Sequence, residues 1–243
     1  MARQFFLTRA KMLAFLNELE GSAGGVRSVY LRVGLSPDKV KSRLEENFDP
    51  GGQPPELPGL IITSPTGAAL FRGKPKTFLV LPPFPITVES SAPGYAAGPL
   101  RSLLKPDYRI ALILVRLGSY AVGLCDGEKL VTSKVGTGLV HGRQRQGGSS
   151  AQRFHLRREN QIHSFLERVC GHVQEKLGTY EPDFVAYGGA RMTIAQLRKE
   201  CRYLSRFEGR TLPPLLDIPD PRQAVLEAAI GRVWSSKIIE WEV

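Results

Sequence analysis

The side chains best suited to chemistry lie in residues 131–158, a stretch rich in basic residues, glycine and glutamine. Gly147 and Gly148 allow backbone conformations that other residues avoid, and they directly precede Ser149 and Ser150, which are of a type that caps helices. The exposed N–H groups of a helix start favour anions. The stretch contains no Asp or Glu, and its basic residues are Lys134, Arg143, Arg145, Arg153, Arg157 and Arg158. Such a local positive field attracts phosphate groups, although a solvated loop followed by a capped helix explains the composition equally well.

Glutamine and histidine supply the other polar groups of this stretch. The amides of Gln146 and Gln152 are neutral, so they could position water or donate a hydrogen bond, but they could not act as strong bases. His141 and His155 could provide acid–base or nuclease chemistry. No carboxylate within 131–158 is available to orient these two histidines.

Composition narrows the classes of partner. The chain has 243 residues, 42% of them hydrophobic and 23% charged, which is typical of a globular protein. Its net charge of +10 favours a polyanionic partner, either nucleic acid or an anionic membrane surface, although a merely soluble basic protein remains an alternative. No apolar run approaches the roughly 20 residues of a membrane helix, and the N-terminus does not resemble a signal peptide. Cys125, Cys170 and Cys201 lack metal-site spacing, so we expect reduced packing cysteines, no metal and a cytoplasmic protein.

The second half of the chain has the pattern of an α/β domain. Hydrophobic periodicity predicts strands at 108–117, 119–124 and 129–136, then a helix over 150–177. Phe154, Ile162, Phe165, Val169 and Val173 are spaced to form the buried face of that helix. A strand at 183–187, a helix at 193–204, a strand at 212–218 and a helix at 221–235 complete the pattern. Hairpin strands followed by crossover strands predict a mixed sheet for residues 99–243.

The first half predicts a separate small α+β domain over residues 1–98. Its expected elements are a helix at 6–20, a strand at 28–33 and a helix at 36–44 with Ser36 as N-cap. A hairpin of 60–63 with 68–71 and a strand at 77–81 follow. Residues 82–98 are rich in proline and small residues, so we place the domain boundary near residue 98.

The order of glycines, caps and basic residues over 142–160 resembles a known family. It is similar to the central domain of the eukaryotic and archaeal class-1 peptide-chain release factors, which has a Gly-Gly-Gln loop and a long arginine-rich helix. The matching residues are Gly147, Gly148, Ser150, Ala151, Arg153, Phe154 and Arg158. Ser149 replaces the family's glutamine, as in the divergent branch that includes the peptidyl-tRNA hydrolases of ribosome-associated quality control. The resemblance implies an RNase H-like mixed-sheet fold for the second domain.

The same resemblance implies hydrolysis of the ester that joins a nascent peptide to tRNA, in the peptidyl transferase centre of the large ribosomal subunit. The implied catalytic residues are Gly147, Gly148, Gln152, Gln146 and Ser149, and the basic side chains of 131–158 would bind RNA. No cofactor, membrane or DNA partner is expected. A ribosome- or tRNA-binding factor that has lost catalysis is one alternative, since the usual glutamine is missing. A nuclease acting on the tRNA acceptor end is the other.

Overall fold

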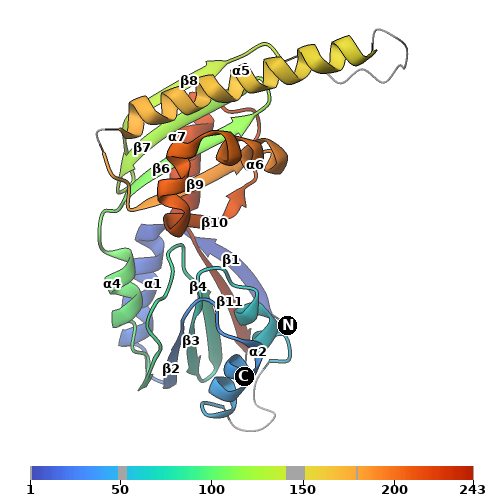
Figure 1. The fold of residues 1–243 in the computed structure, drawn as a ribbon. Helices are drawn as coiled ribbons and strands as arrows, with labels where there is room; N and C mark the ends of the chain where they lie inside the picture. Colours follow the sequence, from blue (N-terminus) through green and yellow to red (C-terminus); the bar gives the residue numbers. More distant parts are fainter. Residues whose placement is uncertain (1, 49–53, 141–150, 179, 243) are drawn as a thin grey trace. The chain divides into compact units, whose positions relative to one another are not determined.

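The computed structural model describes residues 2–48, 54–140, 151–178 and 180–242. The chain divides into two compact units (Figure 1). Unit 1 contains Met1–Pro106 and Gly231–Val243, and unit 2 contains Asp107–Ile230. The boundary therefore lies at residue 106 rather than near 98, and the end of the chain belongs to the first unit. No helix of the described residues is long and apolar enough to cross a membrane.

Unit 1 is built on a six-stranded antiparallel sheet in the order β1-β11-β4-β3-β2-β5. Its strands are β1 (Arg3–Leu7), β2 (Gly25–Leu31), β3 (Ala68–Gly73), β4 (Lys76–Leu81), β5 (Ser90–Pro93) and β11 (Ser236–Glu242). Its helices are α1 (Arg9–Gly21), α2 (Pro37–Glu45), α3 (Leu57–Ile62) and α4 (Gly98–Leu104).

Two local predictions in unit 1 are wrong. Phe6 lies on strand β1 with 69% of its surface exposed, whereas the apolar pattern placed it in the first helix. Residues 57–62 form helix α3 rather than a strand. Leu57 and Ile61 lie one helical turn apart and are both buried, so this short apolar run packs as a helix. Short apolar runs fit either structure, and tertiary packing decides between them.

Strand β11 belongs to the sheet of unit 1, so this unit contains residues from both the beginning and the end of the chain. The strand lies between β1 and β4 and pairs with both in antiparallel register, Ile238 opposite Phe5 and Val80. Ile238 and Ile239 are fully buried, so both faces of the strand are covered. The helix predicted at 221–235 was the last element expected, and the local pattern does not indicate this strand, because its hydrogen-bond partners lie more than 150 residues away.

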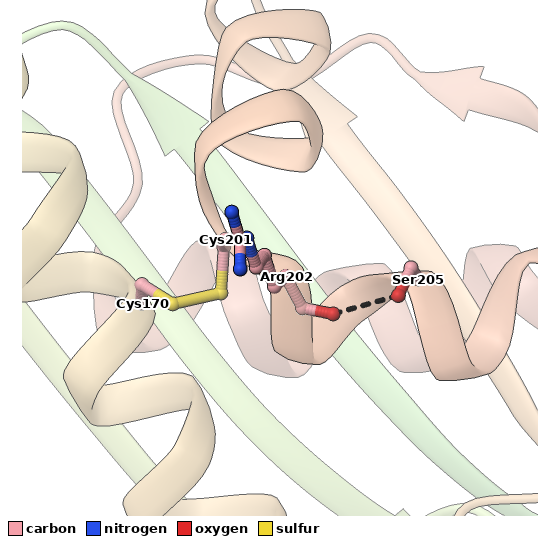
Figure 2. Close-up of a disulfide and its surroundings, with 4 residues drawn as sticks. All are labelled: Cys170, Cys201, Arg202 and Ser205. Atoms are coloured by element: carbon pink, nitrogen blue, oxygen red, sulfur yellow. Dashed lines mark hydrogen bonds between the residues drawn. A yellow bond between two sulfur atoms is a disulfide. The ribbon is translucent and has the colours of Figure 1, made fainter.

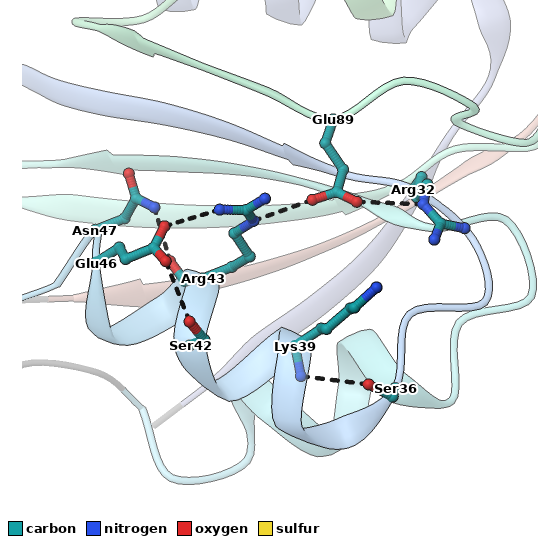
Figure 3. Close-up of polar contacts among 8 residues, drawn as sticks. All are labelled: Arg32, Ser36, Lys39, Ser42, Arg43, Glu46, Asn47 and Glu89. Atoms are coloured by element: carbon teal, nitrogen blue, oxygen red, sulfur yellow. Dashed lines mark hydrogen bonds and ion pairs between the residues drawn. The ribbon is translucent and has the colours of Figure 1, made fainter.

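Helix α2 is held by a polar cluster on the surface of unit 1 (Figure 3). Ser36 caps it, as predicted, by accepting the backbone N–H three residues later at 3.4 Å. Arg43 bridges Glu46 at 3.0 Å and Glu89 at 3.1 Å, and Arg32 also pairs with Glu89 at 3.2 Å. These exposed ion pairs contribute little individually, and together they join α2 to the loop before β5.

Unit 2 confirms the predicted mixed α/β sheet. Its five strands have the order β10-β9-β6-β7-β8; β6, β9 and β10 are parallel, and β7 and β8 are antiparallel to their neighbours. The elements are β6 (Arg109–Arg116), β7 (Ser119–Asp126), β8 (Lys129–Thr137), α5 (Ala151–Leu177), β9 (Phe184–Gly189), α6 (Arg191–Glu200), the 3-10 helix η1 (Arg202–Arg210), β10 (Thr211–Leu216) and α7 (Gln223–Val233). The last three residues of α7 belong to unit 1.

Helices cover both faces of this sheet. Ala111, Ile113 and Val115 of β6 pack in one core with α5, α6 and η1. The alternate residues of β6 are also buried, which is typical of a strand covered on both sides. Helix α7 contributes to the other face, where a Cβ on Gly123 would lie 2.9 Å from Leu226.

A disulfide between Cys170 and Cys201 corrects the expectation of three reduced cysteines (Figure 2). It joins the second half of α5 to the residue that ends α6, with Cα atoms 5.5 Å apart. Cys125 is free and buried. The spacing of the cysteines gave no sign of the pair, because it depends on how α5 packs on α6. The disulfide ties the second half of α5 to the body of unit 2.

Candidate functional site

The structure describes only part of the site that the sequence predicts. Arg143, Arg145, Gln146, Gly147, Gly148 and Ser149 lie outside them, as does His141. Lys134, Gln152, Arg153, Arg157 and Arg158 lie within them. The structure therefore describes the elements on either side of the glycine pair: strand β8 before it and helix α5 after it.

The first turns of α5 have no buried face. Residues 152–157 are all exposed, and the first buried residue of the helix is Ile162. Phe154, which we expected on the buried face, is 46% exposed, because the helix at this point extends beyond the strands of the sheet (Figure 1). A helix of 27 residues is about 40 Å long, longer than a typical strand of roughly 20 Å. The structure thus places residue 152 at the exposed end of a projecting helix.

Basic side chains cluster on this projecting part. Arg153 and Arg157 are exposed and one helical turn apart, and Arg158 is half-buried beside them. Gln152 is exposed in the first turn of α5. Lys134 is exposed on β8, opposite Val122 of β7. The described part of the site is therefore an amide and three guanidinium groups on one helix, with a lysine on a separate strand.

The histidines on α5 pair with glutamates. His155 Nδ1 lies 3.3 Å from Glu159, one turn along the same helix, and both side chains are exposed. His163 Nδ1 lies 3.1 Å from Glu200 of α6. Among the described residues, no three His, Cys, Asp or Glu side chains gather into a possible metal site. The described histidines therefore occupy separate helix-surface positions.

The Gly188–Gly189 end of β9 forms a tight turn into α6. Gly189 has φ of +115°, and a Cβ there would collide with the carbonyl oxygen of Val115. The next residue, Ala190, donates its N–H to that same oxygen at 3.2 Å. Both the backbone conformation and the close approach require glycine. The pair thus positions α6 against β6.

The family of this chain emerges from comparison with known proteins. The model of the Actinobacteria/chloroflexi VLRF1 release factor family matches residues 108–239, which include every strand of unit 2 and all of α5. Two curated relatives are named peptide chain release factor subunit 1. The protein from Thermococcus sibiricus is 25% identical over 191 residues, which cover 67% of this chain and 46% of the relative. The protein from Archaeoglobus fulgidus is 31% identical over 137 residues, which cover 55% and 33%.

The chain thus spans less than half of the length of these relatives. A crystal structure of an archaeal translation termination factor is 18% identical and has a TM-score of 0.42, with 93% of this chain and 73% of that chain covered. The family match carries the assignment, because it extends over more than half of the chain. By that match, the chain belongs to the Actinobacteria/chloroflexi VLRF1 release factor family.

Proposed function

We propose that this chain is a cytoplasmic peptidyl-tRNA hydrolase that frees nascent peptides on stalled ribosomes. The observation that carries the proposal is the start of α5, which begins at Ala151, three residues after Gly148, and is exposed over residues 152–157. Such a helix can enter a narrow cavity without uncovering a hydrophobic core. Membership of a release factor family supports the same reaction.

The reaction needs little acid–base chemistry from the protein. Water attacks the ester carbonyl of peptidyl-tRNA, and negative charge develops on the carbonyl oxygen. A hydrogen-bond donor about 3 Å from that oxygen can stabilise the transition state by several kcal/mol. We assign this role to the backbone at Gly147 and Gly148 together with an amide side chain. Gln152 is the first candidate for the amide, Gln146 the second, and Ser149 could contribute its hydroxyl.

Gln152 is favoured by its position. It lies in the first turn of α5 with its side chain exposed, four residues after Gly148. The side chains of a helix tilt toward its N-terminus, so the amide is directed toward the start of α5, the end that follows the glycine pair in the sequence.

Basic side chains would position this catalytic segment. Arg153 and Arg157 lie about 6 Å apart along α5 and present two exposed positive charges near its start. Ribosomal and transfer RNA are lined with phosphates, which such charges bind with strong salt dependence. Arg143, Arg145, Arg158 and Lys134 would extend the same positive field.

The decisive experiment is to incubate the full chain with purified ribosome–peptidyl-tRNA complexes and to identify both products. Released peptide with an intact tRNA 3′ end would support ester hydrolysis, whereas a shortened tRNA would indicate a nuclease. Co-sedimentation with ribosomes but no released peptide at saturating protein would indicate a binding factor without catalysis. Either of the last two results would refute the proposed reaction.

Variants at saturating protein test the residue assignment. We expect Gly148→Ala to abolish release, Gln152→Ala to lower it substantially and Gln146→Ala to lower it less. Gln174→Ala is the matched control, because Gln174 is exposed near the opposite end of the same helix. Full activity of Gly148→Ala would refute the mechanism. Wild-type release by Gln152→Ala together with loss in Gln146→Ala would move the catalytic amide to Gln146.

A further inference from the structure

A groove of about 530 Å³ lies between helix α5 and the segment that follows strand β8. Arg157, Gln161, Ser164 and Arg168 line it from the helix. They occur at intervals of four, three and four residues, which places them along one face of α5. The groove overlaps the exposed start of α5 at Arg157 and continues to Arg168, along the part of the helix that packs on the sheet. Sequence reasoning included only Arg157 of these residues in its site, although their helical spacing was visible.

The wall opposite the helix is held in place by close packing. Gly138 donates its N–H to the carbonyl of Gly118 at 3.0 Å, and a Cβ on Gly138 would lie 2.6 Å from the ring of Phe165. The backbone here therefore rests directly on α5. Arg168 connects α5 to the end of β8, because its Nη1 donates to the carbonyl of Thr137 at 3.4 Å. Both walls are thus preformed in the described structure.

The lining of the groove favours an anion. It contains two guanidinium groups, the amides of Asn160 and Gln161 and the hydroxyl of Ser164, and none of its lining residues is acidic. Guanidinium groups bind phosphates through several N–H donors. Amides and hydroxyls can both donate and accept, which suits the ribose 2′-hydroxyl as well as phosphate oxygens.

The spacing of the charges indicates an extended ligand. Arg157 and Arg168 are eleven residues apart, so their backbones lie about 16 Å apart along the helix. A ligand that pairs with both guanidinium groups at once needs negative charges spread over a similar length. We propose that this groove binds the ribose–phosphate backbone of RNA over successive phosphates. The choice of RNA over an acidic peptide rests on the proposed function, in which the same helix enters the ribosome.

A charge reversal inside the groove gives the sharpest test. Ser164 is exposed on α5, so Ser164→Glu places a carboxylate among the arginines without disturbing the core, and Ser164→Gln is the neutral control of similar size. The probe is a fluorescein-labelled oligouridylate of twelve nucleotides, titrated with the full chain at several salt concentrations. We expect Ser164→Glu to weaken binding at least fivefold and to flatten the salt dependence, because fewer counterions are released. Ser164→Gln should remain within about twofold of wild type.

Arg168→Ala and Gln174→Glu complete the set. Arg168→Ala should weaken oligouridylate binding and reduce the salt slope by about one unit. Gln174→Glu adds the same charge near the far end of α5, outside the groove lining, and should bind nearly as wild type does. Circular dichroism checks that each variant is folded. Equal binding by Ser164→Glu and Ser164→Gln would overturn the proposal, and so would competition by a polyglutamate peptide as effective as that by unlabelled oligouridylate.

Two further arms identify the source of the RNA and separate this proposal from the hydrolase. A Ser164→Glu defect on deacylated tRNA alone would assign the groove to tRNA, and a defect on large ribosomal subunits alone would assign it to ribosomal RNA. In the peptide-release assay, Ser164→Glu should raise the protein concentration needed for half-maximal release. Absence of release by the wild type would refute the hydrolase and leave the RNA-binding measurements intact. Normal wild-type release with unaffected groove variants would refute the groove alone.

Discussion

The disulfide between Cys170 and Cys201 gives a prediction whose size follows from the structure. The two residues are 31 positions apart in the sequence. In the chain-entropy model, closing a loop of this length in the unfolded chain stabilises the fold by roughly 3 to 4 kcal/mol. For a chain of this size, each kcal/mol shifts the melting temperature by about 2–4 °C. Reduction should therefore lower the melting temperature of the chain by roughly 6 to 16 °C.

The measurement combines scanning calorimetry with thiol counting. Protein purified without reductant and then unfolded should react with one equivalent of alkylating reagent, at Cys125, and reduced protein with three. The double variant Cys170→Ala with Cys201→Ala is the control, because its melting temperature should not respond to reductant. Three reactive thiols in the oxidised preparation would refute the disulfide. One reactive thiol together with an unchanged melting temperature on reduction would refute the loop-closure reasoning.

Reduction of the disulfide should leave the exposed start of α5 unchanged, so it should not affect the proposed peptide release. Cys170 lies in the part of α5 that packs on the sheet, well beyond the exposed residues 152–157. Peptide release measured below the lower melting temperature should therefore be equal in the oxidised and reduced protein.

Three other variants test separate parts of the structure. Gly189→Ala should lower the free energy of unfolding of unit 2 in urea by about 2 kcal/mol or more, because the new Cβ meets the Val115 carbonyl at positive φ. Gly209→Ala is the control and should lower it much less, because a Cβ there has open space. The side chain of Arg101, at 2.6 Å, and the N–H of Ala97 hold the pKa of Glu20 below its usual value. A lowered carboxylate pKa adds stability that is present above the unfolded pKa, near 4.5, and is lost as pH falls through the folded value. Glu20→Gln should thus cost about 1 kcal/mol at pH 7, discounted for solvent screening, and the difference from wild type should shrink in unfolding titrations below pH 4.5. The double variant Arg153→Ala with Arg157→Ala should weaken ribosome co-sedimentation and flatten its salt dependence. The double variant Arg202→Ala with Arg206→Ala, on η1, should change both quantities less. Equal effects of the two double variants would refute a positive field localised at the start of α5.

The sequence by itself determined the elements that depend on interactions between neighbouring residues. Strands β6, β7 and β8 alternate with tight turns at Gly118 and Gly127, both at positive φ, so their hairpins follow from neighbouring residues. The apolar spacing of α5 predicted a long helix, and its basic start together with the glycine pair before it indicated the family. Capping by Ser36 was equally local.

Only the tertiary structure decided the features that depend on distant residues. Strand β11 is completed by hydrogen bonds to β1 and β4, so no local pattern could assign it to unit 1. The pairing of Cys170 with Cys201 depends on how α5 packs on α6. Phe154 fits the helical period of the buried face, yet it is exposed because the sheet ends before the helix does. Periodicity specifies which side chains share a face, but the extent of the neighbouring element decides how much of that face is buried.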